Sequence, residues 1–517
     1  MNKKSFLGMV MLAFSAVANA GGYLTNTNQS VLFLRNPARD AAIGIDGVYS
    51  NPAGVIFLDN GFHLSLNIQN AHQTRSVTST FAPFAFGMNN NKQATKLFKG
   101  VADAPVIPSI LAAYNTNDWS FQFGFAVVGG GGKCEFEHGL GSFECNVALL
   151  PMLLGEKLGV NGYDADSYMR GRQYYFGFTL GAARKLNDNL SVYGGLRMLY
   201  GNSNYYGYLR DIKLSTANAG VVKATDYFSG LSVQAFEAVG QCTEAAKQYA
   251  AAGLAEKAAE YMAMAEAYGA QAYQMAALGK ATENITLNCD QVGWGVAPII
   301  GVDYKAGKLN LAAKYEFKTR MRLKNKAANS ESADNIAQLA RFKDGGSVPE
   351  DSPALLTLGA QYEITPALRV MAGYHHYFDV DTKQYTKNLI GDSNEYLLGA
   401  EYDVNKTLQV SAGVQKTNYS QTDAFMNDIS FNVNSWSFGL GVGINLKKNM
   451  KLNLAYFQTN YTDYNKQNPN YGNLGNLVTT VAGAETANAL INAGALKGAD
   501  TFTRTNRVLG VGLDITF

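Results

Sequence analysis

Along most of this chain, apolar and polar side chains alternate with a period of two. In RVLGVGLDITF (507–517), every second residue from position 509 onward is large and apolar, and the residues between are Gly, Asp or Thr. The stretches WSFQFGFAVV (119–128), QYYFGFTLGA (173–182) and SWSFGLGVGINL (435–446) repeat the pattern. Runs of about ten residues with one apolar and one small or polar face are typical of strands that cross a membrane with one face toward lipid.

Counting such runs predicts fourteen strands, near 61–70, 109–115, 118–128, 173–185, 189–202, 292–305, 308–319, 354–364, 367–379, 395–404, 407–418, 434–446, 450–460 and 506–517. The connections alternate between long segments and short turns, the short ones at 115–118, 186–189, 306–308, 365–366, 405–406 and 447–449. An even strand number with this alternation predicts an all-β fold, a closed antiparallel transmembrane barrel over 61–517 with short periplasmic turns.

The amino-acid composition supports a transmembrane barrel and argues against a nucleic-acid-binding protein and a helical membrane protein. Charged residues make up only 16% of the chain, while 53 are Gly, 30 Tyr and 27 Phe. The formal net charge of +2 gives no indication of a nucleic-acid partner. A mean hydropathy of -0.12, without a long apolar run beyond the N-terminus, argues against a protein of membrane-spanning helices.

The first residues predict export. Lys3 and Lys4 precede an apolar run, and Ala18-Asn19-Ala20 provides a small-x-small cleavage site, so residues 1–20 are expected to be a signal peptide. In an exported chain, an even number of cysteines favours disulfides. Three connectivities are open to Cys134, Cys145, Cys242 and Cys289, and sequential pairing is the preferred one. Their spacing matches no metal site, and we expect neither a metal nor a cofactor.

One long connection differs from the others. Residues 243–280 are rich in Ala, with Glu, Lys and Gln, which predicts a helical insertion of about 237–285 on the extracellular side. The insertion is interpreted as a structural element stapled at its base, with a lid or a partner-docking element as the alternative.

Residues 21–60 do not alternate. They contain the tripeptide Asn-Pro-Ala twice, as Asn36-Pro37-Ala38 and as Asn51-Pro52-Ala53, the second followed by Gly54. Asn before Pro favours turns and extended backbone, so each copy alone indicates no more than a corner. A barrel of fourteen strands is wider than its side chains fill, and a compact segment before the first strand is well placed to fold into the lumen as a plug.

The stretch LRNPARDAAIGIDGVYSNPAGV (34–55) closely resembles the N-terminal hatch of the long-chain fatty-acid transporter family, also called the OmpP/FadL/TodX type. VIPSILAAY (106–114) and SPALLTLGAQYEITPALRVMAGYHHYF (352–378) also resemble family segments. The Ala-rich insertion and the cysteines depart from the family pattern.

The resemblance implies an outer-membrane protein of a Gram-negative bacterium that takes up hydrophobic molecules such as long-chain fatty acids passively. Outer loops would capture the ligand, and a gap in the wall would release it sideways past the hatch into the membrane. The strand kink that opens the wall in the family would fall near Ala126–Gly132. Expected partners are the ligand, outer-membrane lipid with lipopolysaccharide, and the barrel assembly machinery, with the chain as a monomer and not an enzyme.

A carboxylate ligand would need a cation in the lumen. Strand parity places Arg197, Lys314 and Lys318 on the lumen side, with pairing to Glu316 or Asp514 as the alternative for each. His375 also points inward, near the outer rim. Two other functions remain open: a haem or small-ligand receptor on the same barrel, and an outer-membrane hydrolase centred on His375.

Overall fold

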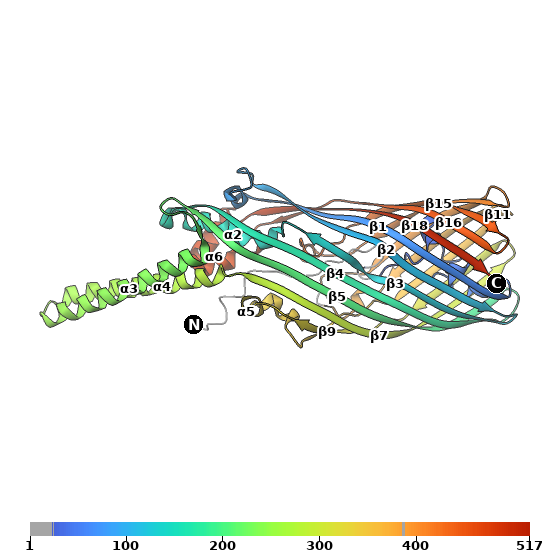
Figure 1. Ribbon diagram of the computed structural model, residues 1–517, viewed down its shortest axis with the longest axis horizontal. Helices are drawn as coiled ribbons and strands as arrows, with labels where there is room; N and C mark the ends of the chain where they lie inside the picture. Colours follow the sequence, from blue (N-terminus) through green and yellow to red (C-terminus); the bar gives the residue numbers. More distant parts are fainter. Residues whose placement is uncertain (1–22, 24, 385–387) are drawn as a thin grey trace.

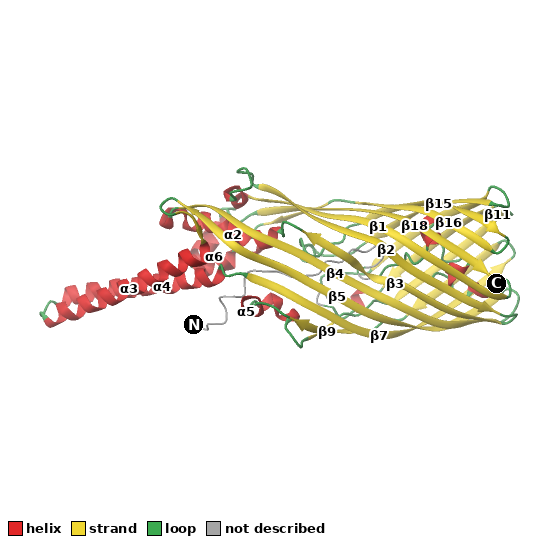
Figure 2. Cartoon of the chain, viewed as in Figure 1, coloured by secondary structure: helices red, strands yellow, loops and turns green. Residues whose placement is uncertain are grey.

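The computed structural model describes residue 23, residues 25–384 and residues 388–517, and the expected signal peptide lies outside this part of the chain. Within these residues, no helix is both long and apolar enough to cross a membrane. Figure 1 and Figure 2 show a long barrel of tilted strands with helices gathered at one end.

Fourteen long antiparallel strands close into a barrel within the described residues, which confirms the predicted fold class. Each pairs with the next along the chain, and the last strand returns to the first, from His63 opposite Thr516 to Phe81 opposite Gly498. The strands are β1 (Gly61–Phe81), β2 (Thr95–Asn115), β3 (Trp119–Phe136), β4 (Val160–Lys185), β5 (Leu190–Thr216), β7 (Ile285–Ala306), β8 (Leu309–Glu316), β11 (Leu355–Thr365), β12 (Leu368–Tyr377), β13 (Ser393–Asp403), β14 (Leu408–Asn418), β15 (Ser435–Lys447), β16 (Met450–Tyr461) and β18 (Gly498–Thr516).

Shorter strands extend or flank this wall. β9 (Arg322–Ala327) and β10 (Ser347–Pro349) pair with each other beyond β8 and β11, and β17 (Tyr464–Asn468) continues the pairing of β16 with β18. β6 (Gly220–Lys223) pairs only with the end of β5. The wall therefore extends well beyond the membrane on one side.

The predicted short turns all lie at the opposite end, together with the C-terminus (Figure 1). Several strands are much longer than predicted, since β4 has 26 residues and β5 has 27. The extra length lies on the outer side, where it encloses a hydrophobic core that includes Phe98, Phe136 and Phe143. Because these outer halves bury apolar residues inward, they lack the lipid-facing pattern from which the strands were predicted.

The membrane part shows the predicted alternation. On β18, Leu509 and Val511 are more than half exposed on the outside of the barrel, whereas the neighbouring Val508 points inward and is buried. Trp436 and Leu440 are likewise exposed on β15. An apolar outer face with a small and polar inner face is the pattern that a lipid bilayer requires.

Helices lie at the outer end and inside the barrel. The longest are α2 (Gly141–Leu158), α3 (Ala224–Ala251) and α4 (Ala255–Ala281). The shorter ones are α1 (Val31–Arg35), η1 (Ile45–Val48), η2 (Gly54–Phe57), η3 (Ala82–Phe86), α5 (Glu331–Asp334), η4 (Ala337–Phe342), η5 (Asp379–Asp381), η6 (Tyr471–Asn473), α6 (Gly475–Ala482) and α7 (Ala484–Asn492).

The helical insertion is an antiparallel pair, α3 and α4, that projects from the outer end of the barrel (Figure 2). It begins at Ala224, earlier than the expected boundary near residue 237, because residues 224–236 continue the same helix. The rest of the predicted division into segments stays a prediction.

The predicted disulfide pairs are wrong: Cys134, Cys145, Cys242 and Cys289 are all free, buried thiols. Cys242 lies in α3, about 27 Å along the helix from its first residue, whereas Cys289 is in the barrel wall on β7. Cys134 is in β3 opposite Gly171, and Cys145 lies on α2 against Gly472. Cys134, Cys145 and Cys289 belong to the same hydrophobic core, but none of the four cysteines forms a disulfide.

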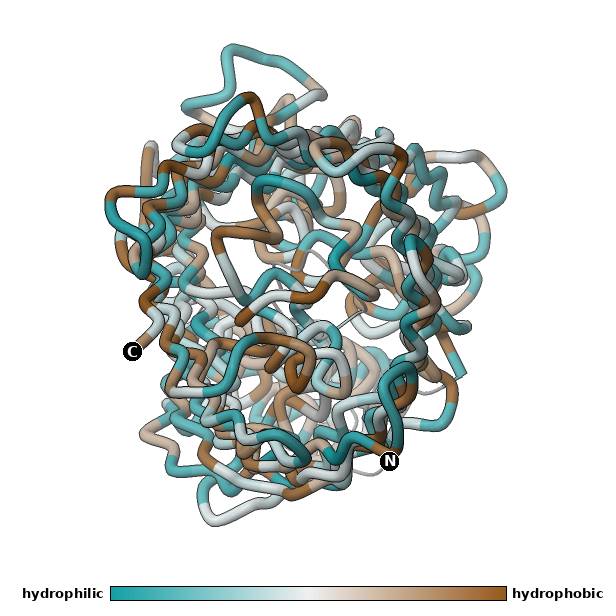
Figure 3. Tube along the Cα trace, turned by 90° about the vertical axis from the view of Figure 1, so that its right-hand side faces the viewer, coloured by the Kyte–Doolittle hydropathy of each residue, from teal (hydrophilic) through white to brown (hydrophobic). Residues whose placement is uncertain are grey.

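The end-on view of Figure 3 shows chain segments inside the ring of strands. Most residues of the segment 25–56 are buried, and its side chains contact strands on several sides of the barrel. The inner segment approaches the wall most closely where glycines of neighbouring strands are aligned. Gly359 lies opposite Gly373 across β11 and β12, and Gly399, Gly413 and Gly439 are aligned across β13, β14 and β15.

These glycines make a close approach possible. A Cβ added to Gly359 would lie 2.5 Å from the carbonyl carbon of Asp40 and 2.6 Å from the nitrogen of Ala41. At Gly439 an added Cβ would overlap the carbonyl oxygen of Leu34. The backbone of the inner segment therefore rests directly on the backbone of the wall, which only glycine allows.

We predict that Gly359→Ala displaces the inner segment while the barrel still folds. The added methyl meets backbone atoms that cannot rotate away, and overpacking of this kind costs about 1–3 kcal/mol. The expected result is a higher conductance in planar lipid bilayers. Gly194→Ala is the matched control, because a Cβ there meets no atom within 4 Å. An equal change in both variants would contradict the close-packing argument.

Candidate functional site

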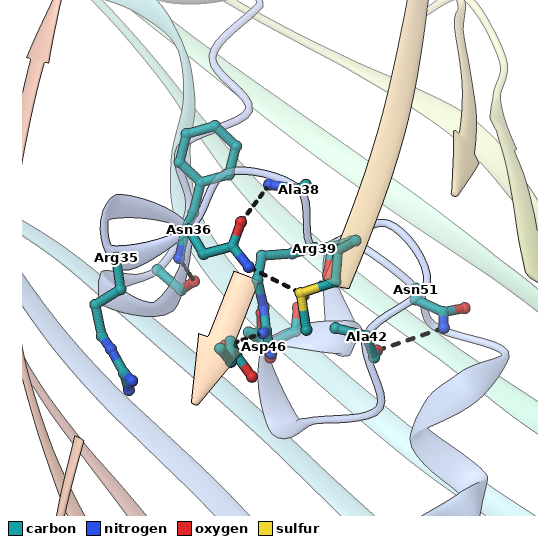
Figure 4. A network of polar contacts seen from close by, with 12 residues as sticks. Arg35, Asn36, Ala38, Arg39, Ala42, Asp46 and Asn51 are labelled. Atoms are coloured by element: carbon teal, nitrogen blue, oxygen red, sulfur yellow. Dashed lines mark hydrogen bonds and ion pairs between the residues drawn. The ribbon is translucent and has the colours of Figure 1, made fainter. Parts of the chain in front are cut away.

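The asparagines of both Asn-Pro-Ala copies, Asn36 and Asn51, make polar contacts inside the barrel (Figure 4). The side-chain oxygen of Asn36 accepts a hydrogen bond from the amide of Ala38, and its amide group lies 2.8 Å from the sulfur of Met371 on β12. The side-chain oxygen of Asn51 accepts from the amide of Gly54, and its amide group donates to Asp303 at 2.6 Å. Each asparagine thus closes its own turn and ties that turn to the wall.

Pro52 and Ala53 add further ties. The carbonyl of Pro52 accepts a hydrogen bond from Gln122, and that of Ala53 accepts one from Ser191. Pro37 packs against Gly413, and Ala38 is fully buried. The segment predicted as the hatch is therefore held by strands from several parts of the barrel.

Arg39 forms the ionic centre of this segment. Its guanidinium donates to Asp46 at 2.7 Å and to Glu401 on β13 at 2.6 Å, and all three side chains are buried. Burial alone would lower the pKa of Arg39, but the two carboxylates raise it above its usual value. The buried arginine therefore fixes the inner segment to the wall, because its removal would leave two buried carboxylates without a cationic partner.

Nearby, Arg35 donates to Ser411, Gln409 and Asn453, which come from strands β14 and β16. The side chain is completely buried although it carries a charge. These contacts give the buried guanidinium of Arg35 hydrogen-bond acceptors on two strands of the wall.

His375 is held by carboxylates on both sides. Its Nδ1 lies 2.8 Å from Glu395 and its Nε2 lies 2.9 Å from Asp40 in the inner segment. Tyr377 also donates to Glu395, at 2.7 Å. Since both ring nitrogens are occupied, the imidazole is neither free to take a proton from a nucleophile nor free to ligate iron.

Two of the three candidate cations are paired. Arg197 forms an ion pair with Glu316, and Lys314 contacts Glu316 at 2.8 Å and the carbonyl of Tyr49 at 2.6 Å. Lys318 lies nearer the outer rim, where it donates to the carbonyl of Asp381. The alternative of pairing with Glu316 therefore holds for Arg197 and Lys314. Ligand binding by these cations and by His375 stays a prediction.

The wall is interrupted between β2 and β3. Pairing runs from Ile110 opposite Phe125 toward the periplasmic end and resumes only at Val101 opposite Glu135. On β3, the pairing with β4 shifts register at Gly129 and again before Gly132. On β2, Pro105 and Pro108 lie within the interruption and lack the backbone donor that a continuous ladder needs.

A cavity of about 250 Å³ opens beside this interruption. Much of its lining is apolar, with polar residues from the inner segment at one side. The lining includes Ala71, Ala104, Ile107, Phe176 and Val508.

The beginning of the inner segment lies against the same place. The amide of Asn26 donates to the carbonyl of Val128 at 2.9 Å, and Thr25 forms a bridge with Gly129. Asn28 exchanges hydrogen bonds with Gln69 on β1. The pairing of β3 is therefore irregular within Ala126–Gly132, where a kink is expected, and residues 25–29 lie against this part of the strand. The kink itself stays a prediction.

Sequence reasoning did not identify residues 25–29 or the two prolines as part of this site. The glycine run was visible, but a flexible strand end explains such a run equally well. The informative signal was the combination of GGGG on one strand with APVIP (104–108) on the neighbouring strand. The glycines provide no side chains to pack along the seam, and the two prolines provide no backbone N–H groups for its hydrogen bonds.

These features define an outer-membrane β-barrel with an occupied lumen and an interrupted wall. Residues 129–422 match the family model described as Gram-negative porin, and the chain belongs to that family. The outer membrane of a Gram-negative bacterium is therefore its location, as predicted.

Solved structures confirm the fold expected from the resemblance. A FadL homologue of Pseudomonas aeruginosa superposes with a TM-score of 0.59 and 11% identity, covering 97% of this chain and 100% of the other. The toluene transporter TodX of Pseudomonas putida gives a TM-score of 0.53 and 15% identity, covering 97% and 100%. No curated protein matches the sequence.

We predict that Arg39→Met releases the inner segment. Leaving Asp46 and Glu401 without this partner should cost about 3–5 kcal/mol, because the carboxylates are buried. The measurement is urea unfolding in detergent, together with protease cleavage between residues 25 and 60.

Arg210→Met is the matched control. Arg210 makes the same 2.7 Å contact through its Nε to Asp166, but on the surface, where an ion pair contributes about 0–1 kcal/mol. Comparable losses in the two variants would show that burial does not matter here.

Proposed function

We propose that this protein is an outer-membrane channel for the passive uptake of hydrophobic small molecules. The interruption between β2 and β3, beside a lumen closed by residues 25–60, is the observation that carries the proposal. The resemblance to fatty-acid transporters and the TodX name of a structural neighbour both indicate apolar cargo.

The route follows from the barriers in the molecule. A ligand that enters from the outer end meets the hatch, with its buried ions and amides, and an apolar molecule gains nothing by displacing them. The opening at β2 and β3 leads instead from the cavity toward the lipid-facing side of the wall. A ligand leaving there passes from an apolar cavity into the membrane without returning to water, which is the favourable direction for an apolar surface.

Residues 36–38 and 51–54 have the role of hatch in this proposal, since their contacts fix the inner segment against the wall. Capture by the outer loops, the barrel assembly machinery as a partner and a monomeric state belong to the same proposal. The cavity volume of about 250 Å³ suits a small aromatic molecule or part of an acyl chain.

We also propose that the protein is not an enzyme. A hydrolase centred on His375 would need a ring nitrogen for its nucleophile, and a haem receptor would need one for iron. Asp40 and Glu395 occupy both nitrogens in the structure. This contact favours a structural role for His375, as an anchor of the hatch.

The uptake experiment uses Ala104→Trp, which fills the cavity beside the opening. Gram-negative cells without another hydrophobic channel should take up radiolabelled oleate or toluene faster when they produce the unaltered protein. The variant should slow uptake about tenfold, as for a barrier higher by about 1.4 kcal/mol.

Ala313→Trp is the control, because Ala313 lies on the lipid-facing side of β8, between Leu311 and Tyr315. It should leave the rate unchanged. Uptake no faster than in cells without the protein, for both probes, would refute the proposed function. Equal uptake by the Ala104→Trp variant would refute the route through the wall.

A further inference from the structure

A row of cations lies on the outside of the barrel, at the edge of β9. The sequence RMRLKNK alternates exposed Arg320, Arg322 and Lys324 with Met321 and Leu323, which are buried. The basic side chains therefore share one face of the wall, and that face is the outer one.

These cations have no carboxylate partner. Among the residues that the structure describes, Arg320, Arg322 and Lys324 form no ion pair, and Arg322 donates only to Ser347. Asp351, the acid that lines the same groove, is buried, and its two oxygens accept from the backbone amides of Met321 and Lys383. The acid thus stabilises the chain at this point and leaves the positive charge of the row uncompensated.

The row borders a groove of about 660 Å³ on the outer surface. The regular pairing of the wall stops after Glu316 and resumes at Arg322, so the strands separate locally and leave a hollow. The apolar side of the groove consists of Tyr200, Val292 and Trp294, and Lys383 adds a further cation. Trp294 is 69% exposed, as is usual for an aromatic ring at the boundary of the lipid-facing belt of a barrel.

The groove lies at the outer boundary of the lipid-facing belt. On β7, exposed apolar side chains run from Tyr304 near the periplasmic turn past Trp294 to Val292 in the groove, and Trp294 lies ten residues from Tyr304. Over this distance the strand advances about 33 Å, which a tilt of about 40° reduces to about 25 Å, the height of such a belt. In Figure 1, β9 lies beside β7 on the lower edge of the barrel, between the helical end and the short turns.

We propose that this groove binds a phosphorylated glycolipid of the outer leaflet, with the lipid A part of lipopolysaccharide as its occupant. The phosphates contact Arg320, Arg322 and Lys324 at the membrane surface, where guanidinium and ammonium groups bind phosphate strongly. An acyl chain lies against Trp294 and continues along Val296 and Ile300, which are exposed on the same strand. The site is separate from the opening between β2 and β3 and does not depend on the proposed uptake function.

Charge and position together favour this occupant. A free anion would bind the cations but would make no favourable contact with the apolar side of the groove, which Tyr200 and Trp294 form. A phospholipid with a single phosphate would satisfy only part of the row. A lipid with two phosphates and several acyl chains matches both halves of the groove.

The test titrates the full-length protein in nonionic detergent with purified lipid A and follows binding by native mass spectrometry. The variant is Arg320→Gln, Arg322→Gln and Lys324→Gln combined, which should weaken binding by about tenfold or more. The matched control replaces the exposed Lys99, Lys213 and Lys223 by Gln, which changes the net charge equally and should alter binding by less than about twofold. Equal weakening in both would reduce the effect to general surface charge and overturn the proposal.

Two comparisons use the unaltered protein and so do not depend on a variant folding. Dephosphorylated lipid A should bind about tenfold more weakly than the phosphorylated form, and phosphatidylglycerol should bind more weakly than lipid A. Inorganic phosphate at millimolar concentration should not displace lipid A. Equal binding of the dephosphorylated lipid or of phosphatidylglycerol, or displacement by phosphate alone, would overturn the assignment.

Discussion

The structure depends on the contact between an irregular inner segment and a wall that approaches it closely at glycines and binds it elsewhere through polar side chains. A barrel of fourteen strands encloses more space than ordinary inward side chains fill. Here residues 25–60 occupy that space, and aligned glycines such as Gly359 and Gly439 bring the two backbones together. Every polar group of the segment must then find a partner in the wall, because no bulk water surrounds it.

This requirement explains why the inner surface is so rich in ions and amides. Arg39 pairs with Asp46 within the segment and with Glu401 in the wall, and Asp40 contacts His375. Arg197 and Lys314 pair with Glu316 beside Tyr49. Arg197, Lys314 and His375, which are candidate ligand-binding residues in the sequence, thus have partners among the buried groups of the wall and the inner segment.

The sequence predicted the barrel well because lipid imposes a period of two on every strand that crosses it. All fourteen strands and the short turns were found where alternation placed them. The outer halves of β4 and β5 were missed because they bury apolar residues inward and show no lipid face. The disulfides were wrong because an even number of cysteines does not show proximity, and Cys242 lies far along a projecting helix.

The site was less accessible to prediction, because it is defined by the absence of pairing between two strands. Neither Gly129–Gly132 nor Pro105 and Pro108 alone indicates an opening, since each is common at the end of a strand. Only their alignment across one seam removes the ladder, and that alignment depends on a register set elsewhere in the barrel. The polar contacts of the inner segment and the interrupted seam are therefore complementary: contacts such as Arg39 with Glu401 occupy the axis of the barrel, whereas between Val101 and Ile110 the described strands β2 and β3 carry no ladder hydrogen bonds that would have to break.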